Sequence, residues 1–149
     1  MRLRRFLIND PMARMTLLGF RQVVPVREVF AVSVDLDHVQ LAIPPGGEAA
    51  ADEFYVGFLG LAVLDKPPAL AARGGRWYAT GTLQIHLGVD RDFRPARKAH
   101  PAFRVRDFDA LRHAFLAADI DVRDDTEIEG VDRFYVDDPF GNRVELIRG

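Results

Sequence analysis

Residues 132–149 read DRFYVDDPFGNRVELIRG, and this stretch decides the fold. It contains two runs with the alternating apolar side chains of a β-strand, joined by DPFGN, whose proline and glycine favour a turn. An earlier stretch, GRWYATGTLQIHLG at 75–88, aligns with it by eye, apart from a shorter turn. The alignment places His86 over Glu145. The chain therefore contains an internal repeat, which is typical of an architecture built from two copies of one unit.

The repeat continues upstream of these two hairpins. DHVQLAI at 37–43 matches AHPAFRV at 99–105, which places His38 over His100. In each copy the strand is followed by a segment with apolar residues at helical spacing, and then by a further strand. The order of one strand, one helix and three strands is written twice. We therefore predict an α+β fold in which two βαβββ repeats form a curved, cup-like mixed sheet.

The boundaries of the two units follow from composition. We assign residues 35–149 to one domain, with a first unit at 35–90, a polar and basic linker at 91–99, and a second unit at 100–149. The basic side chains of the linker are predicted to be solvated, and a lid that contacts an anionic substrate is the alternative. Residues 1–34 are predicted to be an extension of unknown role, because their apolar runs are too short for a signal peptide.

Composition narrows the range of functions. The chain has a formal net charge of -2, which gives no indication of nucleic acid or a membrane surface as a partner. It contains no cysteine, so a metal could be held only by imidazole and carboxylate groups, and cysteine nucleophiles and iron–sulfur clusters are excluded. No apolar run approaches the roughly 20 residues of a membrane span. We expect a cytoplasmic protein that acts on a small molecule.

Strand alternation gathers the ionisable residues on one face of each predicted sheet, opposite the aliphatic side chains. These polar faces carry four residues that can bind a metal: His38, His86, His100 and Glu145. Imidazole nitrogens with one carboxylate suit a divalent ion such as Zn, Fe, Ni, Co or Mn. A single histidine in a buried strand is usually a hydrogen-bonded core residue, and this second interpretation stays open for His86. His113 has no partner in the repeat and is interpreted as structural.

The repeated unit resembles the vicinal oxygen chelate superfamily. The matching runs are DHVQLAI, FYVGFLGL, HPAFRV and FYVDDPFGNRVELI, and the resemblance covers residues 35–149. The superfamily includes glyoxalase I, fosfomycin-resistance thiol transferases, methylmalonyl-CoA epimerase, extradiol dioxygenases and bleomycin-binding proteins. The resemblance implies that His38, His100 and Glu145 occupy the three usual metal-ligand positions. His86 stands at a fourth position, where many metal-binding members carry Glu or Gln, and this departure weakens an assignment to glyoxalase I itself.

The resemblance implies a divalent-metal-dependent enzyme of the glyoxalase/dioxygenase type that chelates vicinal oxygens of a small substrate. It does not separate lyase or isomerase chemistry from thiol transfer or ring-cleaving oxygenation. The ion would act as a Lewis acid that stabilises an enediolate or oxyanion. Glu145 is the candidate base, and Tyr135 is a second catalytic candidate, because the resemblance points it toward the pocket. The candidate substrate-binding residues are Gln40, Gln84, Arg133 and Arg143.

Two further expectations accompany this interpretation. Relatives often pair their units across a homodimer, so we expect a homodimer, with the metal site either within one chain or built from two. The alternative function is a metal-free protein that sequesters a drug or metabolite, as bleomycin-resistance relatives do. The presence of four competent ligands favours the enzyme. Trp77, Phe54 and Tyr55 are interpreted as core residues.

Overall fold

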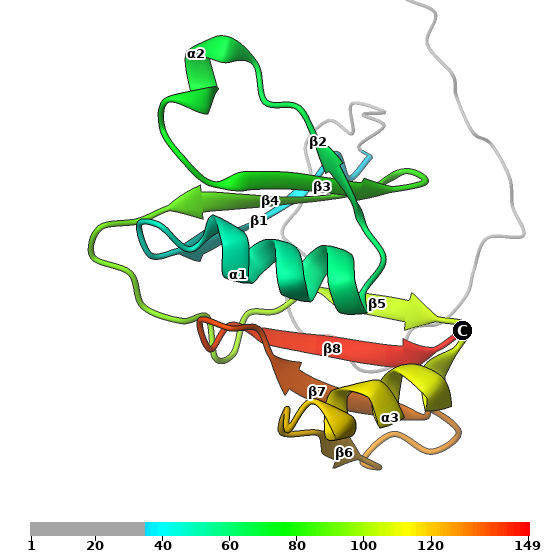
Figure 1. Ribbon diagram of the computed structural model, residues 1–149. Coiled ribbons are helices and arrows are strands. Elements are labelled where there is room, and N and C mark those ends of the chain that lie inside the picture. The colour runs from blue at the N-terminus through cyan, green and yellow to red at the C-terminus, as the bar shows by residue number, and fades with distance from the viewer. Residues whose placement is uncertain (1–34) are drawn as a thin grey trace, which may run out of the picture. The chain divides into compact units, whose positions relative to one another are not determined.

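Eight strands form two four-stranded sheets in the computed structural model, which describes residues 35–149 (Figure 1). In spatial order the first sheet contains β1 (Val39–Ile43), β4 (Leu83–Val89), β3 (Arg76–Thr80) and β2 (Ala62–Leu64). The second contains β5 (Ala102–Val105), β8 (Arg143–Arg148), β7 (Arg133–Asp137) and β6 (Arg123–Asp125). In both sheets the first strand of the unit runs parallel to the last, and the other neighbours are antiparallel. The predicted βαβββ repeats, and with them the fold class, are confirmed.

The helices lie between the strands along the chain, as predicted, but differ in detail. The helical segment predicted after the first strand of the first repeat is an α-helix, α1 (Glu48–Asp52), that continues as a π-helix, η1 (Glu53–Phe58). The second unit carries α3 (Phe108–Ala117). A short helix, α2 (Pro68–Ala71), lies in the loop between β2 and β3 and projects beyond the first sheet (Figure 1). Within residues 35–149, no helix is long and apolar enough to cross a membrane.

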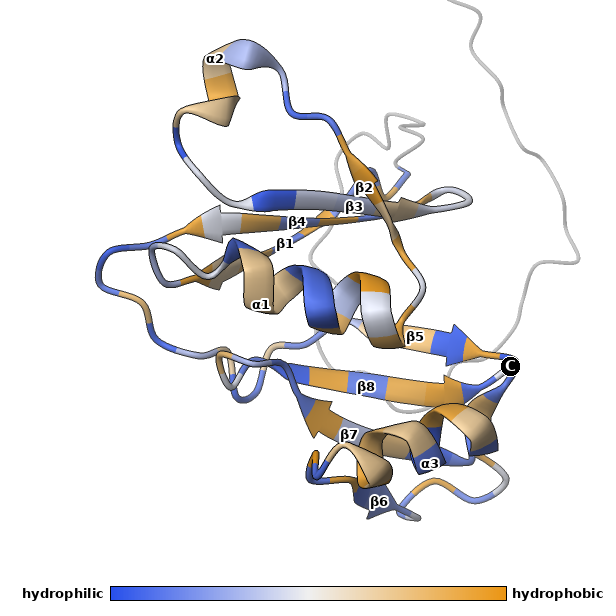
Figure 2. Ribbon diagram, viewed as in Figure 1, coloured by the Kyte–Doolittle hydropathy of each residue, from blue (hydrophilic) through white to orange (hydrophobic). Residues whose placement is uncertain are grey.

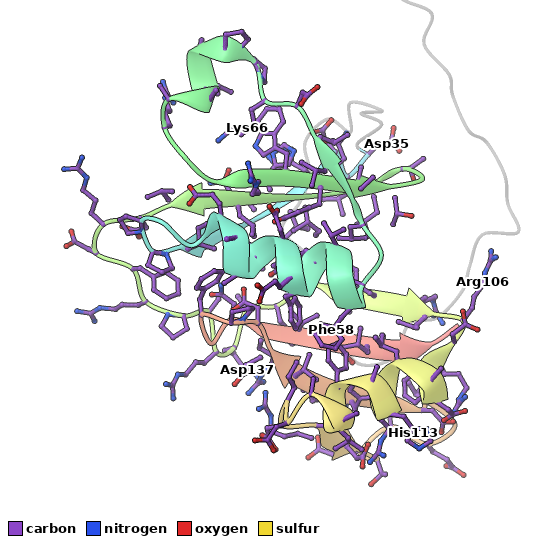
Figure 3. All side chains as sticks on the ribbon, viewed as in Figure 1. Asp35, Phe58, Lys66, Arg106, His113 and Asp137 are labelled. Carbon is purple, nitrogen blue, oxygen red and sulfur yellow. The ribbon has the colours of Figure 1, made fainter. Side chains whose placement is uncertain are left out.

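The hydrophobic core lies where the helices cover the aliphatic faces of the sheets. Figure 2 shows hydrophilic and hydrophobic residues alternating along most of β8. Val144 and Leu146 of this strand are fully buried in the core. The helices of the two units also pack on each other through aromatic rings. Phe54 and Phe58 of η1 lie 5.8 and 4.9 Å from Phe115 of α3, measured between ring centroids. Figure 3 shows Phe58 at this junction. Aromatic packing of this kind joins the two repeats into one core.

A buried polar network also joins the two units. The turn DPFGN supplies Asp138 and Asn142, both buried. The Asn142 Nδ2 donates hydrogen bonds to the Ala42 carbonyl at 3.0 Å and to Asp138 Oδ2 at 2.9 Å, and its Oδ1 accepts one from the Ala96 amide at 2.8 Å. The Tyr55 hydroxyl donates to Asp138 Oδ2 at 3.0 Å. Burial raises the pKa of Asp138, while these donors counteract that rise. The turn therefore connects β1, η1 and the linker.

The boundary predicted at residue 34 separates the described residues from the predicted extension at 1–34, which lies outside them. Residues 35–149, which contain both repeats, form one compact body by themselves. What was predicted for the extension therefore stays a prediction.

Candidate metal centre

His38 and His86 meet on the polar face of the first sheet, the face turned away from the helices. His38 directly precedes β1, and its ring stacks on that of His86 in β4, with centroids 4.0 Å apart and planes inclined by 17°. The other face of His86 lies against Trp77, 4.2 Å away at 8°. Trp77 and His86 are directly opposite each other in the pairing of β3 with β4, which brings their rings together. His86 is therefore the middle ring of a three-ring stack.

The polar contacts of this pair indicate which ring nitrogens carry protons. His38 Nδ1 lies 2.6 Å from Asp37 Oδ1, so we assign its proton to Nδ1, which leaves the Nε2 lone pair available. His86 Nε2 lies 3.2 Å from the Gln84 amide oxygen and donates to it. Only 6% of His86 is exposed. Burial lowers the pKa of His86, and the neighbouring His38 lowers it further, so the ring is neutral near pH 7.

The second pair, His100 and Glu145, lies on the polar face of the second sheet. His100 Nε2 is 3.1 Å from Glu145 Oε2. His100 Nδ1 is 2.7 Å from the Lys98 carbonyl oxygen and donates its proton there. A neutral His100 then points a lone pair at a carboxylate oxygen, so two acceptors face each other. This contact is favourable only when a proton or another cation lies between the two atoms.

Arg133 holds the other oxygen of Glu145. Its Nη1 lies 3.1 Å from Glu145 Oε1, and its Nη2 lies 3.0 Å from Asp125 Oδ1. The hydrogen bond to Asp125 is the main cause of a raised pKa for Arg133, so the group is a permanent cation. Only 13% of its side chain is exposed. In this structure two carboxylates occupy the guanidinium of Arg133, whose predicted substrate contact stays a prediction.

Tyr135 and Arg143 lie beside this second pair. Tyr135 is directly opposite Glu145 in the pairing of β7 with β8, and its ring meets His100 edge to face at 5.5 Å. The Arg143 guanidinium carbon lies 5.2 Å from the centroid of the Tyr135 ring. Burial is the main cause of the raised pKa of Tyr135, and the charge of Glu145 adds to it. The hydroxyl is therefore a neutral group near pH 7.

The two glutamines lie beside the first pair. Gln40 is directly opposite His86 in the pairing of β1 with β4, and its side-chain amide lies against the backbone of Gly88. A Cβ built at Gly88 would lie 2.9 Å from Gln40 Nε2, so the glycine makes room for this side chain. Gln84 is engaged with His86. Gln84 therefore contacts His86, Gln40 lies on the neighbouring strand, and the substrate-binding role of both stays a prediction.

The four predicted ligands form two pairs rather than one cluster. Each repeat contributes one pair, and among residues 35–149 no three His, Asp or Glu side chains gather closely enough to hold a metal ion. A hollow of about 550 Å³ lies between α3 and β6–β7, and one of about 860 Å³ lies between η1 and β5. None of the four predicted ligands lines either hollow. The repeat therefore places the ligands in equivalent positions, but a single chain does not bring all four to one point.

Several contributors to the site were not recognised in the sequence. Trp77 was interpreted as a core residue, yet it is half-buried on the polar face. Lys66, which follows β2 and is labelled in Figure 3, has its Nζ 6.0 Å from the Trp77 ring centroid. Asp37 orients the ring of His38, and the Lys98 carbonyl orients the ring of His100. His113 lies exposed on α3, away from both pairs. Alternation along β3 could have found Trp77, but Lys66 lies in a loop without a periodic signal.

Comparison with known proteins places this architecture. No protein-family model matches the chain, and no curated protein matches it. Among solved structures, a glyoxalase family protein from Bacillus anthracis is 41% identical, with a TM-score of 0.76, over 81% of this chain and 99% of its own. Fosfomycin resistance protein FosX from Listeria monocytogenes is 14% identical, with a TM-score of 0.65, over 79% of this chain and 95% of its own. Lactoylglutathione lyase from Agrobacterium tumefaciens is 21% identical, with a TM-score of 0.61, over 79% and 96%. The last two show a shared fold.

Proposed function

Because the chain belongs to the glyoxalase family, within the vicinal oxygen chelate superfamily, we propose that it is a divalent-metal-dependent enzyme that binds adjacent oxygens of a small substrate. One observation carries this proposal. His100 Nε2 and Glu145 Oε2 are held 3.1 Å apart while the proton of His100 is committed to the Lys98 carbonyl. Two acceptors in this position are well placed to share a cation. Lyase or isomerase, thiol-transfer and oxygenase chemistry remain the candidate reactions.

We propose that a homodimer completes the site, with His38 and His86 of one protomer and His100 and Glu145 of its partner. The two pairs occupy matched positions in the repeats, and a two-fold dimer would bring each pair against the other twice. Each pair lies on the polar face of a sheet, away from the helices of its own chain. The expected donor set of three imidazole nitrogens and one carboxylate suits Zn, Fe, Ni, Co or Mn.

The first pair needs one adjustment to fit this role. An ion lies close to the plane of an imidazole that binds it, and the rings of His38 and His86 are stacked with planes only 17° apart. Both can bind the same ion only if one ring turns. His38 is the one free to do so, because its side chain is 39% exposed. If His86 is instead a packing residue, the ligands His38, His100 and Glu145 remain.

The surrounding residues have distinct proposed tasks. The bound ion would act as a Lewis acid on substrate oxygens. Arg133 restrains Glu145 through Oε1, so that Oε2 stays directed at His100. Glu145 is proposed as a metal ligand and, once it leaves the ion, as the base. Tyr135 would donate a hydrogen bond from its neutral hydroxyl to a substrate oxygen.

Metal analysis tests the proposal directly. Protein purified without a chelator or a histidine tag should contain about one ion per chain, and His100→Ala should lose most of it. Mutating a residue that only hydrogen-bonds to a metal ligand already lowers metal affinity roughly 10–100-fold, so losing a ligand should lower it at least as much. His113→Ala is the matched control, since it removes an exposed histidine from α3 and should keep the metal. Metal-free wild-type protein, or full metal in His100→Ala, would contradict the proposal.

A second candidate function is a metal-free binding protein. It is favoured by one observation, that the histidines have partners within the chain: His86 lies between two rings, and His100 could form an ion pair with Glu145 if it is protonated. This candidate predicts that the wild-type protein takes up no stoichiometric metal at neutral pH. The metal analysis therefore separates the two functions.

A further inference from the structure

We infer that the substrate carries an anionic group in addition to its two chelating oxygens, and that Arg143 is the residue that selects it. This inference rests on the proposed metal-dependent function and specifies the class of its substrate. On the polar face of the second sheet, some arginines form ion pairs with carboxylates and Arg143 does not.

Two arginines of this face are neutralised by carboxylates. Arg133 is held between Asp125 and Glu145. Arg123 reaches Asp137 at 2.5 Å and also contacts a second aspartate. The nitrogens of both guanidinium groups that face these carboxylates are engaged, and Nε of Arg133, which has no hydrogen-bond partner, is buried.

Arg143 differs from these two arginines. It is directly opposite Asp137 in the pairing of β7 with β8, which is the position of a cross-strand ion pair. Asp137 is instead taken by Arg123, and within residues 35–149 Arg143 makes no ion pair with a carboxylate. Its guanidinium lies over the Tyr135 ring, where a cation–π contact holds it. The side chain is thus positioned, and no carboxylate of the described residues balances its charge.

The position of Arg143 relates this charge to the proposed centre. Arg143 and Glu145 are two residues apart on β8, so their side chains share a face and lie roughly 6–7 Å apart along the strand. The Tyr135 ring that supports Arg143 also contacts His100. An anion bound by Arg143 would therefore lie a few bonds from oxygens held beside Glu145.

The spacing of Arg143 and Glu145 suits a small acid. Two adjacent oxygens, such as those of a 2-hydroxy or 2-oxo acid, would occupy the centre, and a separate carboxylate or phosphonate would reach Arg143. The planar guanidinium binds either group through two parallel hydrogen bonds. Lys66, close to Trp77 on the other polar face, adds a second cation near the first histidine pair.

The test uses two ligands that differ only in this anionic group. Malate and 2-hydroxybutyrate both offer a hydroxyl and a carboxylate oxygen for chelation, but malate has a second carboxylate where 2-hydroxybutyrate has a methyl group. Their affinities would be measured on the full-length protein loaded with Co²⁺, from changes in the visible absorption of cobalt. We expect malate to bind about 10–100-fold more tightly, since a hydrogen-bonded charge contributes roughly 1.5–3 kcal/mol.

The variants assign this preference to one side chain. Arg143→Gln should remove the preference for malate while leaving cobalt content unchanged, and Arg143→Lys should keep part of the preference. Arg104→Gln is the matched control. Arg104 is exposed on β5 and lies directly opposite Ile147. Ile147 is two residues after Glu145 on β8, and Arg143 is two residues before it, so the two arginines lie on opposite sides of Glu145 along the strand. Its loss should leave the preference intact.

The outcomes separate this inference from the proposed function. A wild-type protein that takes up no cobalt overturns both. Cobalt uptake without a preference for malate, or with a preference that survives Arg143→Gln, overturns the anionic substrate alone.

Discussion

Replacing Asn142 by alanine tests how the two repeats are held together. The Asn142 side chain is buried and makes three hydrogen bonds, to Ala42, Asp138 and Ala96, at 3.0, 2.9 and 2.8 Å. These partners come from β1, the turn and the linker, so one truncation removes contacts to three parts of the chain. Asn142→Ala removes all three hydrogen bonds, while Asp138 keeps those from the Tyr55 hydroxyl and from the backbone amides of Phe140 and residue 142.

The size of the effect follows from these contacts. A typical hydrogen bond contributes about 1 kcal/mol net, and an unsatisfied buried partner adds to the loss. We expect Asn142→Ala to lower the free energy of unfolding by about 3 kcal/mol. Tyr55→Phe removes a single hydrogen bond to Asp138 and should cost about 1 kcal/mol.

Urea unfolding at pH 7, followed by far-ultraviolet circular dichroism, measures both values. The comparison needs equal denaturant dependence in all three proteins, since a changed slope would indicate a loss of two-state unfolding. If Asn142→Ala unfolded with a free energy within about 0.5 kcal/mol of the wild type, the network would not join the repeats, and the reasoning would be wrong.

Two further predictions concern the three-ring stack. Trp77 is the only tryptophan, and its ring stacks on His86. Its emission should change as Zn²⁺ binds, because His38 turns out of the stack and the ion then binds His86, the ring beside Trp77; stoichiometric zinc with unchanged emission would contradict this. The pKa of His86 is lowered by burial, so the unfolded chain takes up a proton on this residue first, and the free energy of unfolding should fall as pH drops through about 6.5. Urea unfolding at pH 7.5 and 5.0 should show a smaller fall for His86→Phe than for the wild type, and an equal fall would argue against this role.

The repeat made most of the fold predictable. The repeat gives the order of elements along the chain, and strand alternation gives the face on which His86 and Glu145 lie. Alternation does not give the distance between two sheets, because that distance depends on how the helices of the two units pack. The sequence therefore could not show that the ligands would form two pairs in one chain.

Other features depend on contacts between distant residues. The turn at Asp138 was predicted from its proline and glycine, but its burial against η1 arises only when the two repeats pack together. Trp77 was interpreted as a core residue because large aromatic residues usually are. Its neighbour Tyr78 occupies the core instead, and alternation along β3 turns Trp77 to the opposite face.

Subunit mixing tests the shared metal site most directly. His38→Ala and His100→Ala break different pairs, so each homodimer should bind little metal. After the two variants are unfolded together and refolded, about half of the dimers should be mixed, and each mixed dimer should hold one intact site, or about 0.25 ion per chain overall. Recovery of metal to this level is the result predicted by a site built from two protomers. A mixture that binds no more metal than the separate variants would contradict it.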